Sequence, residues 1–154
     1  MNASILCIGT ELEKFVLQRP DFWKILVKKI RKVYKGKLTY AANWDDDFEF
    51  TQFWNQMDYI GLQAYYPLTK KEKPNLLEIK EGWKPYVKKL REISKKLKKQ
   101  ILFTEVGYRP DIYATSKPWA WGSTFERLYK KKSDETQLLA YKALYEKLWN
   151  ESWF

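Results

Sequence analysis

Four short apolar runs constrain the fold of this chain more than any other feature; they lie at residues 4–9, 38–42, 58–64 and 101–104. None of them alternates with polar residues, and such continuous runs are typical of parallel strands that are buried on both faces. Parallel strands joined by right-handed crossovers lie side by side, here in chain order. The sequence therefore predicts an α/β fold with one parallel sheet of four strands.

Amphipathic helices are predicted between these runs. Apolar residues recur at helical spacing in residues 21–34 and 81–98, and a short helix is predicted within 48–57. Pro20 and Gly36 suit the start and the end of the first of these helices.

The last predicted helix follows a long loop, residues 110–132, and loops of this length are uncommon unless they have a function. Ser133 is predicted to cap the helix, and Asp134 and Glu135 suit its positive N-terminal end. The helix is expected to continue to about Trp149.

Four βα units are half of an eight-stranded TIM barrel, and we predict one partial barrel domain over residues 1–154. A small doubly wound sheet is the structural alternative, but no Gly-rich phosphate loop follows any apolar run.

The composition excludes several kinds of site. The chain has no histidine, which removes Ser-His-Asp and Cys-His catalysis and histidine-based metal sites. Its single cysteine, Cys7, cannot form an internal disulfide and is predicted to be buried and inert. No run approaches the roughly 18 apolar residues of a membrane span. We expect no metal, no organic cofactor and no membrane partner.

The net charge of +10 raises the question of nucleic-acid binding. The lysines fall on the polar faces of the predicted helices, however, and arginine, which specific recognition of phosphates and bases favours, is scarce. A solvated outer face is the preferred interpretation.

Polar and aromatic side chains follow each apolar run, where the carboxyl ends of parallel strands share one rim. Two glutamates stand out: Glu11 closes the first run and Glu105 closes the fourth. Paired carboxylates are the groups that glycoside hydrolysis needs, one to donate a proton and one to attack or to activate water. Aromatic residues make up 18% of the chain, and Trp and Tyr stack well on sugar rings.

The strand ends resemble glycoside hydrolase family 113 in four motifs, in order: GTEL, LTYAANWD, DYIGLQAYYPL and ILFTEVGYRP. The family consists of bacterial β-1,4-mannanases with a (β/α)8 barrel, in a clan of retaining glycosidases. The similarity covers essentially the whole chain and corresponds to barrel strands four to seven. It lacks the first three strands and the last, and Thr10 stands where many clan members have Asn.

The resemblance implies that Glu11 is the general acid/base and Glu105 the nucleophile. A tyrosine that hydrogen-bonds the nucleophile is expected at Tyr65, with Tyr66 as the second choice. The full set of residues expected to bind substrate is Thr10, Asn43, Trp44, Tyr65, Tyr66, Tyr108, Arg109 and Trp119.

The predicted function is that of a retaining glycoside hydrolase, acting on β-1,4-mannan or manno-oligosaccharides by double displacement. Two alternatives stay open: a non-catalytic sugar-binding remnant of such an enzyme, and a basic protein that stacks single-stranded nucleic acid on its aromatic residues.

An isolated half-barrel is expected to expose two strand edges, which invite pairing or aggregation. Three explanations are considered: a truncated or excised product, a half-barrel completed by another chain such as a second copy, or a remnant without catalysis. Glu11 and Glu105 belong to the outermost strands, so curvature of the sheet is needed to bring them together. No secretory signal is visible, which favours the cytoplasm if the chain is complete and allows secretion if an N-terminal region is missing.

Overall fold

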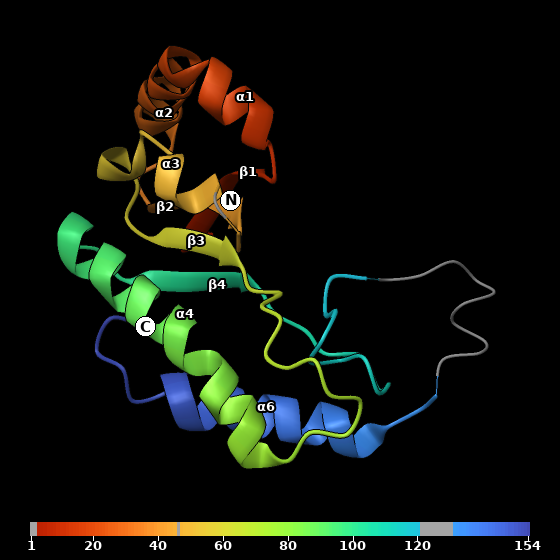
Figure 1. Ribbon diagram of the computed structural model, residues 1–154. Helices are drawn as coiled ribbons and strands as arrows, with labels where there is room; N and C mark the ends of the chain where they lie inside the picture. The colour runs from red at the N-terminus through yellow and green to blue at the C-terminus, as the bar shows by residue number, and fades with distance from the viewer. Residues whose placement is uncertain (1–2, 46, 121–130) are drawn as a thin grey trace. The chain divides into compact units, whose positions relative to one another are not determined.

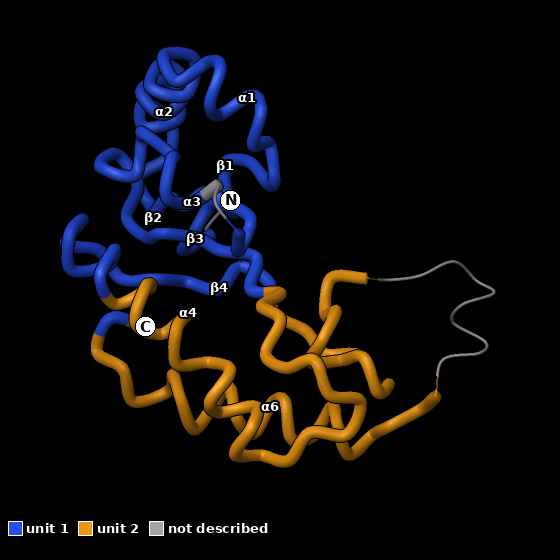
Figure 2. The backbone as a smooth tube through the Cα atoms, viewed as in Figure 1, with its two compact units in different colours: residues 1–64, 92–105, 153 blue, residues 65–91, 106–152, 154 orange. Residues whose placement is uncertain are grey.

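A computed structural model describes residues 3–45, 47–120 and 131–154. The chain divides into two compact units, one comprising residues 1–64, 92–105 and 153 and the other residues 65–91, 106–152 and 154 (Figure 2). The expectation of one domain over residues 1–154 stays a prediction.

The first unit contains one sheet of four parallel strands, β1 (Ile5–Thr10), β2 (Lys37–Asn43), β3 (Ile60–Gln63) and β4 (Ile101–Glu105) (Figure 1). Their order in the sheet is β1-β2-β3-β4, which confirms the predicted parallel sheet in chain order. With its helices, the sheet resembles part of a TIM barrel. All four carboxyl ends consequently lie at one edge of the sheet.

The helices of the first unit are mostly short. They are α1 (Glu13–Gln18), α2 (Pro20–Val33), α3 (Asp47–Phe50), the 3-10 turn η1 (Trp54–Gln56) and the last turns of α4 (Leu76–Leu97). Pro20 occupies the first turn of α2, as the sequence predicts. Helix α1 is missing from the sequence prediction because it has six residues and buries only Val16, too little for a periodic pattern.

Aromatic side chains form much of the core of the first unit. The ring of Trp23 from α2 lies 5.3 Å from the ring of Tyr40 on β2 and stacks on Phe53 at 5.1 Å. A Cβ atom on Gly9 would lie 2.8 Å from the Trp23 indole, so the absence of a side chain on β1 lets α2 approach the sheet. Part of the aromatic excess in the composition is therefore structural.

The prediction that every strand is buried on both faces is wrong for β1. Ile5 is 40% exposed and Leu6 36%, whereas β2 and β3 are almost wholly buried. The prediction that Cys7 is buried is wrong as well: its side chain is exposed, and its Sγ donates a hydrogen bond to the Gly9 carbonyl at 3.2 Å. The reason is position: within the described residues β1 pairs with β2 alone, and an edge strand loses the neighbour that would bury it.

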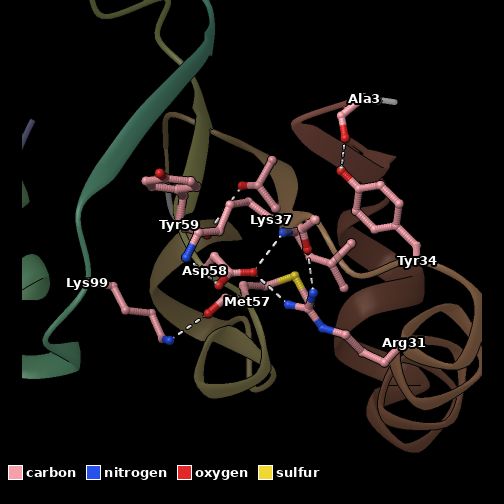
Figure 3. A network of polar contacts seen from close by, with 11 residues as sticks. Ala3, Arg31, Tyr34, Lys37, Met57, Asp58, Tyr59 and Lys99 are labelled. Carbon is pink, nitrogen blue, oxygen red and sulfur yellow. Dashed lines mark hydrogen bonds and ion pairs between the residues drawn. The ribbon is translucent and has the colours of Figure 1, made fainter. Parts of the chain in front are cut away.

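Asp58 forms a network of polar contacts at the amino-terminal ends of the strands, opposite the edge at which their carboxyl ends lie (Figure 3). Its Oδ2 atom accepts hydrogen bonds from Arg31 Nη2 of α2 at 2.6 Å and from the backbone N–H of Leu38 on β2 at 2.8 Å. Lys37 Nζ lies 3.4 Å from Oδ1, and Arg31 also donates to the Gly36 carbonyl at 2.6 Å. Burial would raise the pKa of Asp58, but these donors outweigh it and hold the pKa below the usual 3.8.

The Asp58 network predicts a pH dependence of stability. Because the folded-state pKa lies below 3.8, the contribution is complete above that value and is lost as the pH falls through the lower folded-state pKa. We expect Asp58→Asn to lower the free energy of unfolding by about 1–3 kcal/mol at neutral pH and to flatten its fall in acid. Urea unfolding between pH 2.5 and 7 measures both effects. The exposed Asp21→Asn is the control, with an expected change below about 1 kcal/mol, and equal acid profiles for wild type and Asp58→Asn would contradict the prediction.

The second unit is built on the first turns of α4 and on α6 (Asp134–Leu148). The sequence places the start of α4 near residue 81, but the helix begins at Leu76. Asn75 explains the difference, because its Oδ1 accepts from Glu78 N at 3.0 Å while its own N–H donates to Glu78 Oε2 at 3.0 Å. This is a capping box, which stabilises one more helical turn than the apolar pattern indicates.

The start of α6 agrees with the sequence prediction. Ser133 Oγ accepts a hydrogen bond from Thr136 N at 3.1 Å, so Ser133 caps the helix as expected. Lys80 of α4 pairs with Glu146 of α6 at 2.7 Å. Across the described residues, no helix is long and apolar enough to cross a membrane.

Candidate active site

The carboxyl-terminal edge of the sheet gathers five of the polar residues of the first unit, all at strand ends: Thr10, Glu11, Asn43, Gln63 and Glu105. Asn43 is paired in register with Gln63, and Gln63 with Glu105. Residues paired across parallel strands point to the same face of a sheet. An amide, a second amide and a carboxylate therefore form a row across β2, β3 and β4, which we call the polar row (Asn43, Gln63, Glu105).

A shift of register in β4 places Glu105 in this row. Leu62 pairs with Phe103, but the next residue, Gln63, pairs with Glu105, so Thr104 is an extra residue opposite β3. In a regular strand Glu105 would share the face of Phe103, two positions earlier. The extra residue turns Glu105 to the opposite face. Irregularities of this kind are found next to active sites, where they redirect a side chain.

The other outer strand has a similar shift just before Glu11. Cys7 pairs with Thr39 and Thr10 pairs with Ala41, so β1 advances three residues over a stretch in which β2 advances two. Both candidate carboxylates thus follow a local irregularity, on the two outermost strands of the sheet.

Glu11 has a backbone conformation that non-glycine residues seldom adopt. Its φ is 51°, in the left-handed region, and its N–H donates to the Ala41 carbonyl at 2.9 Å. The next N–H, of Leu12, donates to the Tyr40 hydroxyl at 2.7 Å. Residues held in this region cost on the order of 1 kcal/mol and cluster at functional sites. The Glu11 side chain is exposed, and so is that of Glu105, whose carbonyl accepts from Ala64 N at 2.7 Å.

Trp44 directly follows β2 and is partly exposed, as is Asn43. The structure therefore places Thr10, Glu11, Asn43, Trp44 and Glu105 in the same unit. The sequence analysis did not include Gln63 among the candidate site residues. Its position at the end of an apolar run, just before Tyr65 and Tyr66, could have identified it.

The remaining predicted residues belong to the second unit. The Tyr66 ring is buried against Trp83 at 5.4 Å and Tyr86 at 4.4 Å. Tyr65 lies beside Gly107, its Cε1 atom 3.9 Å from the place of a Cβ on that glycine, and so adjoins the segment that follows β4.

Tyr108 is 3% exposed and packs edge-on against Tyr141 at 5.2 Å, while its carbonyl accepts from Gln137 Nε2 at 2.6 Å. Burial, with a smaller effect of Tyr141, raises the pKa of the Tyr108 hydroxyl far above its usual value. This tyrosine therefore stays neutral at all ordinary pH values.

Arg109 holds the following loop together. Its guanidinium pairs with Asp111 at 2.8 Å, with both side chains almost buried, and donates to the carbonyls of Pro118 and Ala120. Trp119, between these two acceptors, is 43% exposed. These contacts indicate that Arg109 orders the loop that carries Trp119.

No group of three or more acidic or cysteine side chains that could hold a metal ion occurs in the part of the chain that the structure describes. The first unit offers two exposed carboxylates, amide groups and the indole ring of Trp44, a set that suits proton transfer and nucleophilic attack on a sugar.

Several solved structures are similar to this chain. The β-mannanase AaManA of family 113 from Alicyclobacillus acidocaldarius, in complex with ManMIm, is 24% identical with a TM-score of 0.79, over 99% of this chain and 42% of that one. A second β-1,4-mannanase of the family is 22% identical with a TM-score of 0.80, over 99% and 43%. A β-glucuronidase from Ruminococcus gnavus is 17% identical with a TM-score of 0.67, over 97% and 24%.

This chain therefore spans less than half the length of the mannanases whose fold it shares. A search among curated proteins finds no match. The model of Glycoside Hydrolase Family 113, in contrast, matches residues 1–154. The chain belongs to glycoside hydrolase family 113.

Proposed function

We propose that this chain supplies the two-glutamate centre of a retaining glycoside hydrolase that acts on β-1,4-mannan or manno-oligosaccharides. The observation that carries the proposal is the position of Glu11 and Glu105, each just after a register shift at the carboxyl edge of one parallel sheet, in a chain of this family. A mannanase of the same fold is known in complex with ManMIm, which supports the choice of substrate class.

The proposed reaction has two steps. In the first, a Glu105 carboxylate oxygen attacks the anomeric carbon, the glycosidic C–O bond breaks, and Glu11 gives its proton to the departing oxygen. In the second, Glu11 takes a proton from water as the water attacks the same carbon, and Glu105 is released as a carboxylate. Two inversions leave the product with the configuration of the substrate.

Substrate binding is proposed for residues at the strand ends and for one of the two tyrosines that follow β3. Thr10, Asn43 and Trp44 lie at the ends of β1 and β2, where hydroxyl, amide and indole groups suit sugar hydroxyls and ring faces. Tyr65 is a better candidate than Tyr66, because the ring of Tyr66 is packed between other aromatic side chains.

The site proposed here calls for further barrel strands. Glu11 and Glu105 lie on the outermost strands of the sheet, and Ile5 and Leu6 on β1 are exposed. A strand from a second copy or from another polypeptide segment would cover this edge and favour the curvature that a retaining site needs, with carboxyl groups about 5–5.5 Å apart.

The test is the stereochemistry of the product. Purified chain is incubated with mannohexaose, and ¹H NMR follows the anomeric protons before mutarotation. We expect the β-anomer to form first, at a rate per chain that rises with protein concentration if a second copy completes the barrel. An α-anomer would contradict the retaining mechanism. Binding without turnover would favour the sugar-binding remnant.

A further inference from the structure

Gln63 is the central member of the polar row and has no role in the reaction as described. It is the last residue of β3, it is 6% exposed, and its register partners are Asn43 on one side and Glu105 on the other. The shift in β4 that turns Glu105 to this face places the two side chains on the same side of the sheet.

The carboxamide of Gln63 is available to a ligand. In the part of the chain that the structure describes, its side chain forms no hydrogen bond, although it can donate two and accept two. The residue is largely buried, but its amide nitrogen and oxygen are not fully enclosed by protein atoms. A polar group that the protein leaves accessible and without a partner beside a carboxylate is therefore a candidate for a partner in the substrate.

The chemistry of the row indicates the kind of partner. Sugar hydroxyls both donate and accept hydrogen bonds, and a carboxamide offers both functions on adjacent atoms. A carboxylate alone only accepts. Two amides beside the Glu105 carboxylate thus provide the mixed donor and acceptor set that a polyhydroxylated ring requires, on strands that are more rigid than loops.

We propose that Gln63 contacts the substrate, its carboxamide hydrogen-bonding a hydroxyl of the sugar ring held beside Glu105. The inference rests on the proposed function in taking that sugar to be a mannosyl unit. It assigns Gln63 to recognition, separately from the attack by Glu105 and from proton transfer by Glu11.

The test compares stability with binding. Gln63→Met keeps nearly the shape of the side chain and removes its hydrogen-bonding groups. If Gln63 serves the substrate, the midpoint of thermal unfolding should stay constant or rise, since the change removes no hydrogen bond of the folded protein. The dissociation constant for mannohexaose, measured by calorimetry at a pH and temperature where hydrolysis is slow, should rise about 10-fold. The exposed Gln52→Leu should change neither quantity.

Two results would overturn the inference: unchanged affinity in Gln63→Met, or an unfolding midpoint that falls together with the affinity, as for a residue that only supports the fold. If Gln63→Met does not fold, Gln63→Glu is measured instead; it keeps the length and loses the donor, and unchanged affinity there overturns the inference as well. Failure of the wild-type chain to bind any manno-oligosaccharide would also overturn the inference. Binding that depends on Gln63 without any hydrolysis would leave the inference standing and contradict the proposed function alone.

Discussion

Replacing Glu105 by Gln is expected to lower the hydrolysis of manno-oligosaccharides by on the order of 10⁴-fold or more, because an amide is too weak a nucleophile to form the glycosyl-enzyme. The structure supports the choice of residue, since the shift in β4 turns this side chain to the face of Gln63 and Asn43. The measurement is kcat on mannohexaose, with circular dichroism to show that the variant is folded. Added azide should restore turnover in a smaller variant, Glu105→Ala, and give the α-mannosyl azide.

The companion variant Glu11→Gln separates the two roles. A general acid contributes about 10²- to 10⁴-fold, and its loss should matter little for the first step with a nitrophenyl substrate, whose leaving group needs no proton. Glu105→Gln should be equally inactive on both substrates. The control is Glu92→Gln, which removes an exposed carboxylate elsewhere in the first unit. Turnover that persists in Glu105→Gln would refute the assignment of the nucleophile.

Gly82→Ala is expected to destabilise the second unit by at least about 3 kcal/mol, although the same change in an exposed helix normally stabilises by about 1 kcal/mol. Gly82 lies inside α4, where a Cβ atom would collide with the carbonyl oxygen of Leu68 and lie 2.6 Å from its carbonyl carbon. Backbone atoms cannot rotate away as a side chain can. Leu68 is also held in place, since its N–H donates to the Thr115 carbonyl at 2.7 Å.

The control for this prediction is Gly107→Ala. A Cβ on Gly107 would make one ordinary contact, with Tyr65 Cε1 at 3.9 Å, and should change the free energy of unfolding by less than about 1 kcal/mol. Chemical unfolding followed by Trp fluorescence gives both values. A Gly82→Ala chain as stable as wild type would show that α4 and the segment at Leu68 are not packed as described.

Much of the first unit follows from local pattern. The continuous apolar runs predict the parallel strands and their order, because parallel pairing and right-handed crossovers leave few alternatives. The ends of those runs also identify Glu11 and Glu105 as residues of one edge. The cap at Ser133 is equally local, since a hydroxyl followed by acidic residues suits the first turn of a helix.

The exposure of β1 and the start of α4 depend on contacts that the hydrophobic pattern of the sequence does not encode. The apolar run of β1 resembles that of a buried strand, yet Ile5, Leu6 and Cys7 are exposed because burial depends on which neighbours a strand has. The early start of α4 rests on hydrogen bonds between Asn75 and Glu78 that lie before its apolar stripe begins.

Hydrophobic patterning along the chain is enough to predict a parallel α/β sheet with two glutamates at one edge, because strand direction and residue order follow from it. The face that each of those side chains occupies depends instead on how the strands pair. The extra residue at Thr104 turns Glu105 toward Gln63, and a register shift is a relation between two strands, which is absent from the pattern of either strand alone.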